Sequence, residues 1–162
     1  MPKPGDIAAG IRLAVFDVDG VFTDGLIWIG SDGTEYKSFS VRDGVGVKAL
    51  IRAGVEVAVI SGRSSRAVDI RMAELGVAHV VQGCSEKVPA LEQLMSRLGV
   101  EAREVAYLGD DLPDLPAMRV AALPATVADA PAPVKAVALW TASSPGGHGA
   151  VREFCEFLLE HR

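Results

Sequence analysis

Short apolar runs that end in polar or glycine residues recur along the chain, a pattern typical of buried parallel strands. Ile11–Phe16 is mostly apolar and is followed at once by two aspartates and a glycine. We expect further strands of this kind at Val55–Ile60, His79–Val81 and Val105–Leu108, and weaker ones at Val120–Leu123 and Ala136–Leu139.

Segments with helical periodicity separate these runs, at Asp43–Ala53, Ser64–Leu75, Ser85–Leu98, Asp114–Met118 and Ala150–Glu160. When strands and helices alternate in this way, each helix connects two parallel strands by a right-handed crossover. The sequence therefore predicts an α/β fold, a doubly wound Rossmann-like parallel sheet with helices on both faces.

Two segments depart from this alternation. Leu26–Ile29 and Glu35–Phe39 flank a turn-forming stretch rich in glycine and aspartate, so residues 25–39 are predicted to form a small β-hairpin insertion. The Ala/Pro-rich stretch Pro124–Pro133 has no clear period and is predicted to be a surface loop.

Composition limits the kind of protein. A chain of 162 residues with 49% apolar residues fits one globular domain over residues 1–162. The net charge of −5 argues against a nucleic-acid surface or an anionic membrane patch as partner. Met1–Gly10 lacks the apolar stretch of a signal peptide, and no run is long enough to span a membrane. With only Cys84 and Cys155, reduced thiols in the cytoplasm are expected.

Polar clusters follow four of the predicted strands. They are Asp17-Val18-Asp19-Gly20, Ser61-Gly62-Arg63, Gly83-Cys84-Ser85-Glu86-Lys87 and Gly109-Asp110-Asp111. Taken singly, each cluster also fits a turn or a helix cap. Because ligands of open α/β sheets bind beyond the carboxyl ends of the strands, we expect the four clusters to share one site.

The residue types in these clusters match the needs of phosphate-ester hydrolysis through a covalent intermediate. Asp17 can serve as the carboxylate nucleophile, and Asp19 as the acid and base that serves the leaving group and the attacking water. Mg²⁺ would be held by carboxylates, drawn from Asp17, Asp110 and either Asp111 or Asp114. The hydroxyl of Ser61 and the ammonium of Lys87 can bind the phosphoryl oxygens.

With these residues in place, the chain resembles the phosphatases of the haloacid dehalogenase superfamily, whose four motifs match Asp17-x-Asp19-Gly20, Ser61, Lys87 and Gly109-Asp110-Asp111-x-x-Asp114. Within the superfamily it is most similar to the 3-deoxy-D-manno-octulosonate 8-phosphate (KDO 8-phosphate) phosphatases. The strings that carry this similarity are Asp17–Gly25, Phe39–Gly44, Ile60–Arg63 and Gly146–Glu153.

The resemblance implies hydrolysis of KDO 8-phosphate to KDO and phosphate, a step toward lipopolysaccharide precursors. It also implies that Mg²⁺ is held by the Asp17 carboxylate, the Asp19 backbone carbonyl and Asp110. The resemblance further implies a homotetramer. In it, the hairpin after Asp24 would replace a cap domain, and a neighbouring subunit would help to close each site.

The contacts to the sugar acid are less well defined by the resemblance. This chain has Phe22 where the family usually carries leucine, His148 where arginine is common, and a shorter segment after the last helix than many members. A sugar acid carries a carboxylate, which suits the planar donors of Arg42 or Arg63. The candidate substrate-binding residues are Thr23, Arg42, Gly62, Arg63 and His148.

Three other functions share part of this pattern. A nonulosonate 9-phosphate phosphatase, acting on a sialic-acid type of sugar, would use the same motifs. A phosphorelay receiver domain also combines an aspartate nucleophile, an acid pair, a hydroxyl and a lysine, but it places the acid pair early in the chain and the nucleophile on a middle strand. A non-catalytic binding module would not need every catalytic position to be filled.

Overall fold

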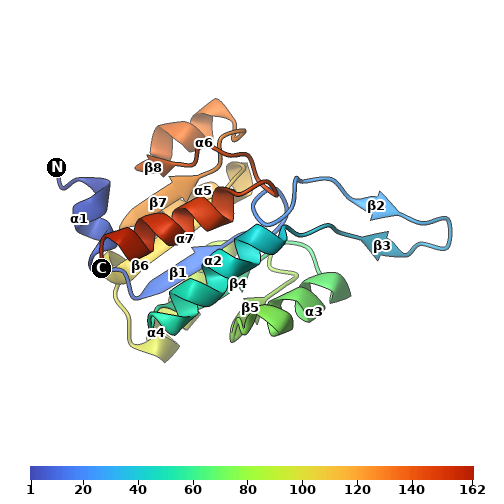
Figure 1. The fold of residues 1–162 in the computed structure, drawn as a ribbon, viewed down its shortest axis with the longest axis horizontal. Coiled ribbons are helices and arrows are strands. Elements are labelled where there is room, and N and C mark those ends of the chain that lie inside the picture. The colour runs from blue at the N-terminus through green and yellow to red at the C-terminus, as the bar shows by residue number, and fades with distance from the viewer.

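A six-stranded parallel sheet forms the centre of the molecule in the computed structural model, which describes all residues 1–162 (Figure 1). The strand order is β5-β4-β1-β6-β7-β8. The strands are β1 (Leu13–Phe16), β4 (Glu56–Ile60), β5 (His79–Val81), β6 (Val105–Gly109), β7 (Leu123–Thr126) and β8 (Trp140–Thr141). The predicted α/β fold with a doubly wound parallel sheet is confirmed.

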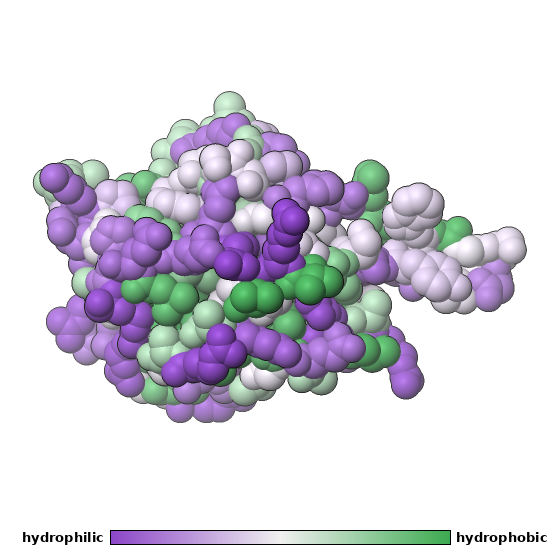
Figure 2. All heavy atoms as spheres, viewed as in Figure 1, coloured by the Kyte–Doolittle hydropathy of each residue, from purple (hydrophilic) through white to green (hydrophobic).

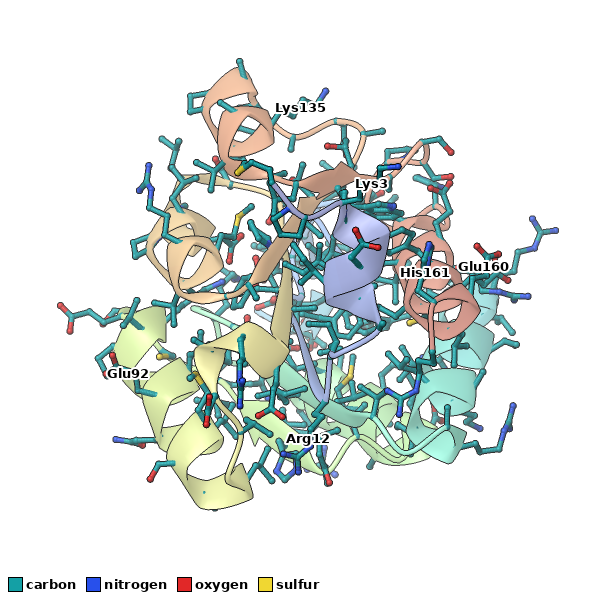
Figure 3. All side chains as sticks on the ribbon, turned by 90° about the vertical axis from the view of Figure 1, so that its left-hand side faces the viewer. Lys3, Arg12, Glu92, Lys135, Glu160 and His161 are labelled. Carbon is teal, nitrogen blue, oxygen red and sulfur yellow. The ribbon has the colours of Figure 1, made fainter.

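Helices cover both faces of this sheet. They are α1 (Pro4–Ala8), α2 (Val41–Arg52), α3 (Arg66–Leu75), α4 (Lys87–Leu98), α5 (Leu115–Val120), α6 (Ala132–Val137) and α7 (Ala150–Glu160), with short 3₁₀ turns η1 (Ala102–Glu104) and η2 (Leu112–Asp114). In Figure 3, α2 and α7 lie on one side of the sheet, and α4 and α5 lie on the other. No helix of the chain combines the length and apolar composition that crossing a membrane demands.

The connections between strands run to opposite sides of β1. The chain leaves β1 for β4 on one side, and β6 pairs with β1 on the other. The N–H of Asp17 continues this pairing by donating to the Leu108 carbonyl at 3.0 Å. Because the connections run in opposite directions from this point, the carboxyl ends of β1 and β6 border a crevice that side chains from several elements can reach.

The hairpin stands clear of the main body. Strands β2 (Trp28–Ile29) and β3 (Glu35–Tyr36) form a separate antiparallel pair that projects from one end of the molecule (Figure 1). It is shorter than the sequence predicts. The space-filling view shows green and pale side chains along this projection, with purple ones among them (Figure 2). Trp28 and Ile29 are 65% and 71% exposed, so the chain alone leaves the hairpin without an apolar partner.

The core holds 41 buried apolar residues in one contiguous cluster. Aromatic rings occupy its centre, where Phe16 packs against Phe22 and Phe154 at centroid distances of 5.5 Å and 5.9 Å. The phenylalanine at position 22 therefore fills a fully buried place directly behind the first strand end.

Three predictions in the last third of the chain are wrong. Val120–Leu123 was expected to be a strand, but Val120 ends α5 and the strand begins at Leu123. Ala136–Leu139 was also expected to be a strand, whereas Ala132–Val137 is helical and β8 follows it. Pro124–Pro133 is not a loop throughout, since its first residues belong to the buried strand β7. The small residues in this region show no helical or strand periodicity in hydrophobicity. Pairing with β6 is what makes Leu123–Thr126 a strand.

Candidate active site

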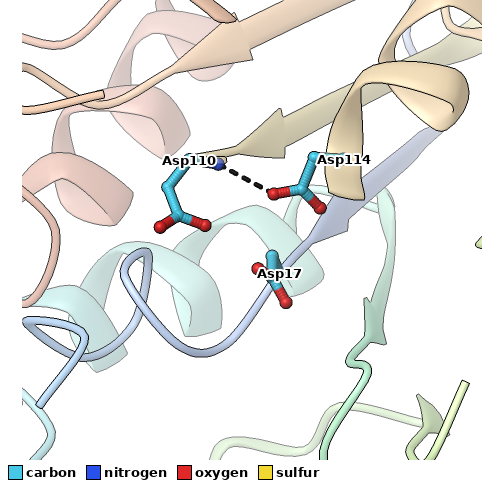
Figure 4. A group of neighbouring side chains, drawn as sticks. All are labelled: Asp17, Asp110 and Asp114. Atoms are coloured by element: carbon cyan, nitrogen blue, oxygen red, sulfur yellow. Dashed lines mark hydrogen bonds between the residues drawn. The ribbon is translucent and has the colours of Figure 1, made fainter. Parts of the chain in front are cut away.

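Three carboxylates meet at the carboxyl edge of the sheet. Asp17 follows β1, Asp110 follows β6, and Asp114 closes the 3₁₀ turn η2 (Figure 4). Each offers an oxygen, and these oxygens all lie within 4.8 Å of one another. Three carboxylates held so close repel one another unless cations or hydrogen-bond donors compensate their charge.

Asp114 receives its compensation entirely from the protein. Its Oδ1 accepts hydrogen bonds from Lys87 Nζ at 2.7 Å and Tyr107 Oη at 3.1 Å. Its Oδ2 accepts from the backbone N–H groups of Asp110 at 2.9 Å and Asp111 at 3.3 Å. A carboxylate has about four lone-pair sites, so this buried side chain has none left for a further ligand. It fixes the turn that carries Asp110.

Asp17 is only partly compensated. Its Oδ1 lies 3.0 Å from Lys87 Nζ and accepts the N–H of Val18 at 2.7 Å. Burial of this carboxyl, followed by the nearby charge of Asp114, raises its pKa to about 6 despite Lys87. The second oxygen has no hydrogen-bond donor within the chain.

Asp110 is the least compensated of the three. Burial, then the charges of Asp17 and Asp114, raise its pKa to about 9. Its carboxylate lies against Gly20, where an added Cβ would come within 1.9 Å of Oδ2, and Gly20 also has φ +86°. Only glycine therefore allows Asp110 to approach the loop that follows Asp17.

Asp17 and Asp110 together fit a divalent cation. The two acids lie close together with free oxygens, and burial, followed by the charges of neighbouring carboxylates, raises the pKa of both. Hard oxygen donors of this kind are what Mg²⁺ selects. Asp114 belongs to the same cluster, but its oxygens are already occupied by four donors.

Lys87 supplies the positive charge of the site. It is the first residue of α4, and its side chain is 5% exposed. Burial alone lowers the pKa of this ammonium, but the charges of Asp17 and Asp114 outweigh that effect and raise it. Lys87 is thus held as a cation between the two acids, where it also faces the cavity described next.

A cavity of about 270 Å³ opens above these residues. Ser61 follows β4, and its N–H donates to the Val81 carbonyl at 2.9 Å, which fixes the end of that strand beside the end of β5. Eight of the eleven residues that line the cavity are charged or polar. Its lining residues are Asp17, Asp19, Gly25, Ser61, Gly62, Arg63, Lys87, Asp110, Asp111, Pro113 and Asp114.

Asp19 lies at the mouth of this cavity and has a cationic partner that the sequence analysis missed. Lys37, just after β3, places its Nζ 2.5 Å from Asp19 Oδ1. The Lys37 side chain is only 1% exposed. Nothing in the local sequence marks this lysine, because the hairpin fold alone brings it back to the loop after β1. The only feature of the sequence that could have pointed to Lys37 is its place in the second segment of the predicted hairpin.

Thr23 lies beneath the loop rather than in the cavity. It is fully buried, and its Oγ1 accepts the N–H groups of Gly20 and Gly25, each at 3.2 Å. From the other side, the N–H of Gly147 donates to the Val21 carbonyl at 3.0 Å, and a Cβ on Gly146 would meet the Gly20 oxygen at 1.8 Å. The loop that carries Asp17 and Asp19 is therefore fixed by packed backbone on both sides.

Arg42 and His148 lie apart from the other predicted site residues. Both line a second cavity of about 340 Å³, formed by residues 40–42 and 147–149. Arg63 does line the main cavity, where its guanidinium is half exposed and contacts Glu35 Oε2 at 3.2 Å. Of the five predicted substrate contacts, the structure thus places Gly62 and Arg63 at the acidic site.

Comparisons with known proteins agree with one another. The family model for haloacid dehalogenase-like hydrolases matches residues 36–122. A 3-deoxy-D-manno-octulosonate 8-phosphate phosphatase of Salmonella typhi is 45% identical over 152 residues, which is 94% of this chain and 81% of that protein. The enzyme of the same name from Escherichia coli is 45% identical over 161 residues, which is 98% of this chain and 86% of that protein.

Solved structures give the same picture. The 3-deoxy-D-manno-octulosonate 8-phosphate phosphatase of Moraxella catarrhalis, in complex with magnesium ion, phosphate ion and KDO, matches with a TM-score of 0.96 at 44% identity, covering 98% of this chain and 91% of that one. A cobalt-bound phosphatase from Haemophilus influenzae matches with a TM-score of 0.93 at 42% identity, covering 96% and 91%.

Proposed function

Because this chain belongs to the haloacid dehalogenase-like hydrolase family, we propose that it is a magnesium-dependent phosphatase that hydrolyses KDO 8-phosphate to KDO and phosphate. The observation that carries the proposal is the convergence of Asp17, Lys87 and Asp110 at one cavity whose lining residues are mostly charged or polar. The bound magnesium, phosphate and KDO in the Moraxella catarrhalis relative support both the cofactor and the substrate.

Asp17 is proposed as the nucleophile. Its carboxylate oxygen attacks phosphorus, the bond from phosphorus to the ester oxygen breaks, and an aspartyl phosphate forms. The Val18 N–H and Lys87 hold the carboxylate in place for this attack through its Oδ1. Water then attacks the phosphorus, phosphate leaves, and the Asp17 carboxylate is regenerated.

Asp19 is proposed to move the protons. A sugar alkoxide is a poor leaving group, so the Asp19 carboxyl donates its proton to the departing oxygen. The resulting carboxylate then takes a proton from the attacking water, which restores the starting state. Asp19 lines the cavity two residues after Asp17, as both steps require.

Ser61 and Lys87 are proposed to bind the transferring phosphoryl group. Both line the cavity together with Asp17, and Lys87 is held there as a cation by its contacts with Asp17 and Asp114. Fixed donors of this kind stabilise the charge on the non-bridging oxygens during transfer.

The Asp17 and Asp110 carboxylates and the Asp19 backbone carbonyl are the groups proposed to hold Mg²⁺. The metal supplies, when bound, the positive charge that lets a carboxylate approach a phosphate dianion. Asp110 is proposed to act in this binding role, since the missing side chain of Gly20 lets its carboxylate lie close to that of Asp17.

The carboxylate of the sugar acid is proposed to bind Arg63, whose guanidinium is half exposed at the cavity. Gly62 allows close approach beside it, and Thr23 supports the loop from below. Arg42 and His148 remain candidates for the far end of the sugar, because their cavity adjoins the Gly147 backbone that contacts the loop.

We further propose one domain over residues 1–162, a cytoplasmic location and a homotetramer. The single core cluster supports the first point. The exposed Trp28, Ile29 and Tyr36 of the hairpin support association, because apolar side chains grouped on a projection favour a partner surface. In such an assembly the hairpin takes the place of a cap domain, and a neighbouring subunit completes the closure of each site.

The values of kcat/KM for KDO 8-phosphate, a nonulosonate 9-phosphate and a neutral hexose phosphate test this function. We expect the octulosonate to be preferred and turnover to require Mg²⁺. Equal values for both sugar acids, or a preference for the neutral sugar phosphate, would refute the substrate. Stable phosphorylation of Asp17 without turnover would instead indicate a receiver-like switch.

A further inference from the structure

Lys37 is a buried cation whose only ionic partners are two carboxylates. Its Nζ lies 2.5 Å from Asp19 Oδ1 and 3.5 Å from Glu35 Oε1. Lysine is rarely buried unless it is paired, and this side chain is 1% exposed. The buried ammonium of Lys37 thus contacts Asp19, the residue proposed to move protons. The mechanism proposed above gives Lys37 no role.

The contact divides the two oxygens of Asp19. Lys37 engages Oδ1, whereas no group of the protein donates a hydrogen bond to Oδ2. The Asp19 side chain is 20% exposed and lines the cavity. One oxygen is therefore anchored and the other is free to meet a ligand, which is the arrangement that a carboxyl group needs to transfer a proton in a defined direction.

We propose that Lys37 is a positioning residue of this phosphatase, which holds the Asp19 carboxyl with its free oxygen toward the leaving-group oxygen of the substrate. This inference rests on the proposed function, since it assigns Lys37 a role in that reaction. Proton transfer requires heavy-atom separations of about 2.6–3.2 Å, so a carboxyl that can rotate freely spends less time in a productive position.

Glu35 is the second counter-ion of Lys37. Its Oε1 lies 3.5 Å from Lys37 Nζ, and its Oε2 contacts Arg63 at 3.2 Å. Because a buried ammonium is costly unless it is compensated, this second carboxylate helps to hold Lys37 in place beside Asp19.

If the ion pair between Lys37 and Asp19 had only a structural role, its loss would affect the turnover of substrates differently. In that case the pair would serve only to connect the base of the hairpin to the loop after β1. Its loss would then disturb Asp17 and Asp19 together, and every substrate would suffer alike. A positioning role instead affects substrates according to how much their leaving group needs a proton.

The test compares two phosphate esters in the full-length protein with Mg²⁺. KDO 8-phosphate releases an alkoxide that needs a proton, whereas 4-nitrophenyl phosphate releases a phenolate that leaves without one. Rapid-quench measurement of the first turnover gives the rate constant for phosphoenzyme formation. Lys37→Met removes the ammonium and keeps the chain length, Lys37→Arg restores a cation, and Lys48→Met is the control at an exposed lysine of α2.

General acid catalysis contributes about 10²–10⁴-fold, so Lys37→Met should lower the rate constant for the sugar phosphate by about 30-fold or more, and that for the aryl phosphate by about 3-fold or less. Lys37→Arg should recover part of the loss, and Lys48→Met should match the unmodified protein. Equal losses for both esters, or no loss for either, would overturn the inference.

Two provisions keep the test decisive. If Lys37→Met does not fold, Lys37→Gln carries the same comparison, because its shorter, uncharged amide cannot replace the ammonium at Asp19. If the unmodified protein cleaves the aryl ester but not KDO 8-phosphate, the proposed substrate fails, and the comparison is made with the best alkyl phosphate found. The role of Lys37 is then decided independently of that substrate.

Discussion

Asp114→Asn is expected to lower the stability of the protein more than it lowers the affinity for Mg²⁺. The carboxylate accepts four hydrogen bonds, two on each oxygen. Asparagine has one acceptor and one donor group in the same shape. Whichever way the amide turns, its NH₂ faces either two backbone N–H groups or the ammonium of Lys87.

The loss can be estimated from these contacts. Hydrogen bonds to a charged group contribute about 1.5–3 kcal/mol each, and an unsatisfied buried group costs about 1–3 kcal/mol. Two mismatched donors, partly relieved by local shifts, suggest a loss of about 3 kcal/mol. For a chain of this size, each kcal/mol lowers Tm by about 2–4 °C, so Tm should fall by about 6–12 °C.

Urea unfolding with and without Mg²⁺ measures this effect, and titration of the folded variant with Mg²⁺ measures the affinity. Asp32→Asn is the matched control, because Asp32 is exposed in the hairpin turn, lies outside the cavity and accepts the backbone N–H of Thr34. A variant that keeps its stability but loses Mg²⁺ affinity would show that Asp114 is a metal ligand. That result would refute the assignment of its four hydrogen bonds as structural.

Three further outcomes follow from the site. Asp17→Asn should abolish turnover, and removal of Mg²⁺ by a chelator should do so reversibly; residual steady-state activity in either case would contradict the mechanism. Burial and the charge of Asp114 raise the pKa of Asp17 to about 6, and burial with the charges of Asp17 and Asp114 raises that of Asp110 to about 9. In the metal-free protein the stability that these two groups contribute is therefore fully present below the ordinary value near 4 and is lost as pH rises through the raised values. Mg²⁺ must displace the protons of the Asp17 and Asp110 carboxyls in order to bind. The increase in Tm that Mg²⁺ causes should therefore be larger at pH 8 than at pH 5. An equal or smaller increase at pH 8 would show that these two carboxyls do not hold the metal. Gly20→Ala places a Cβ 1.9 Å from Asp110 Oδ2 at a φ of +86°, and should weaken Mg²⁺ binding more than it lowers Tm, which titration and thermal unfolding together would show.

The acidic site was predictable because strand ends are local features of the sequence. The end of an apolar run such as Ile11–Phe16 is visible in the sequence, because polar residues follow it directly. Parallel strands bring their carboxyl ends to one edge of the sheet. Asp17, Ser61, Lys87 and Asp110 could therefore be grouped without coordinates, and the structure brings them to one cavity.

Other features depend on tertiary structure and were not predictable. Lys37 reaches Asp19 only because the hairpin turns back on itself, and no local pattern distinguishes it from an exposed strand lysine. Arg42 and His148 have suitable chemistry, but the packing of the segment after β8 places them around a separate cavity. The strands β7 and β8 were misplaced because pairing in the sheet overrides the weak preferences of alanine and proline.

The packing of Gly146 and Gly147 against the loop of Asp17 also has a consequence for biosynthesis. The ribosome makes the catalytic loop some 120 residues before the backbone that supports it, and α7 follows that backbone. A nascent chain that already carries every acid of the site still lacks this support. Phosphatase activity should therefore arise late and abruptly during synthesis, when α7 docks on α2, so that the growing chain does not act on sugar phosphates before its fold is complete.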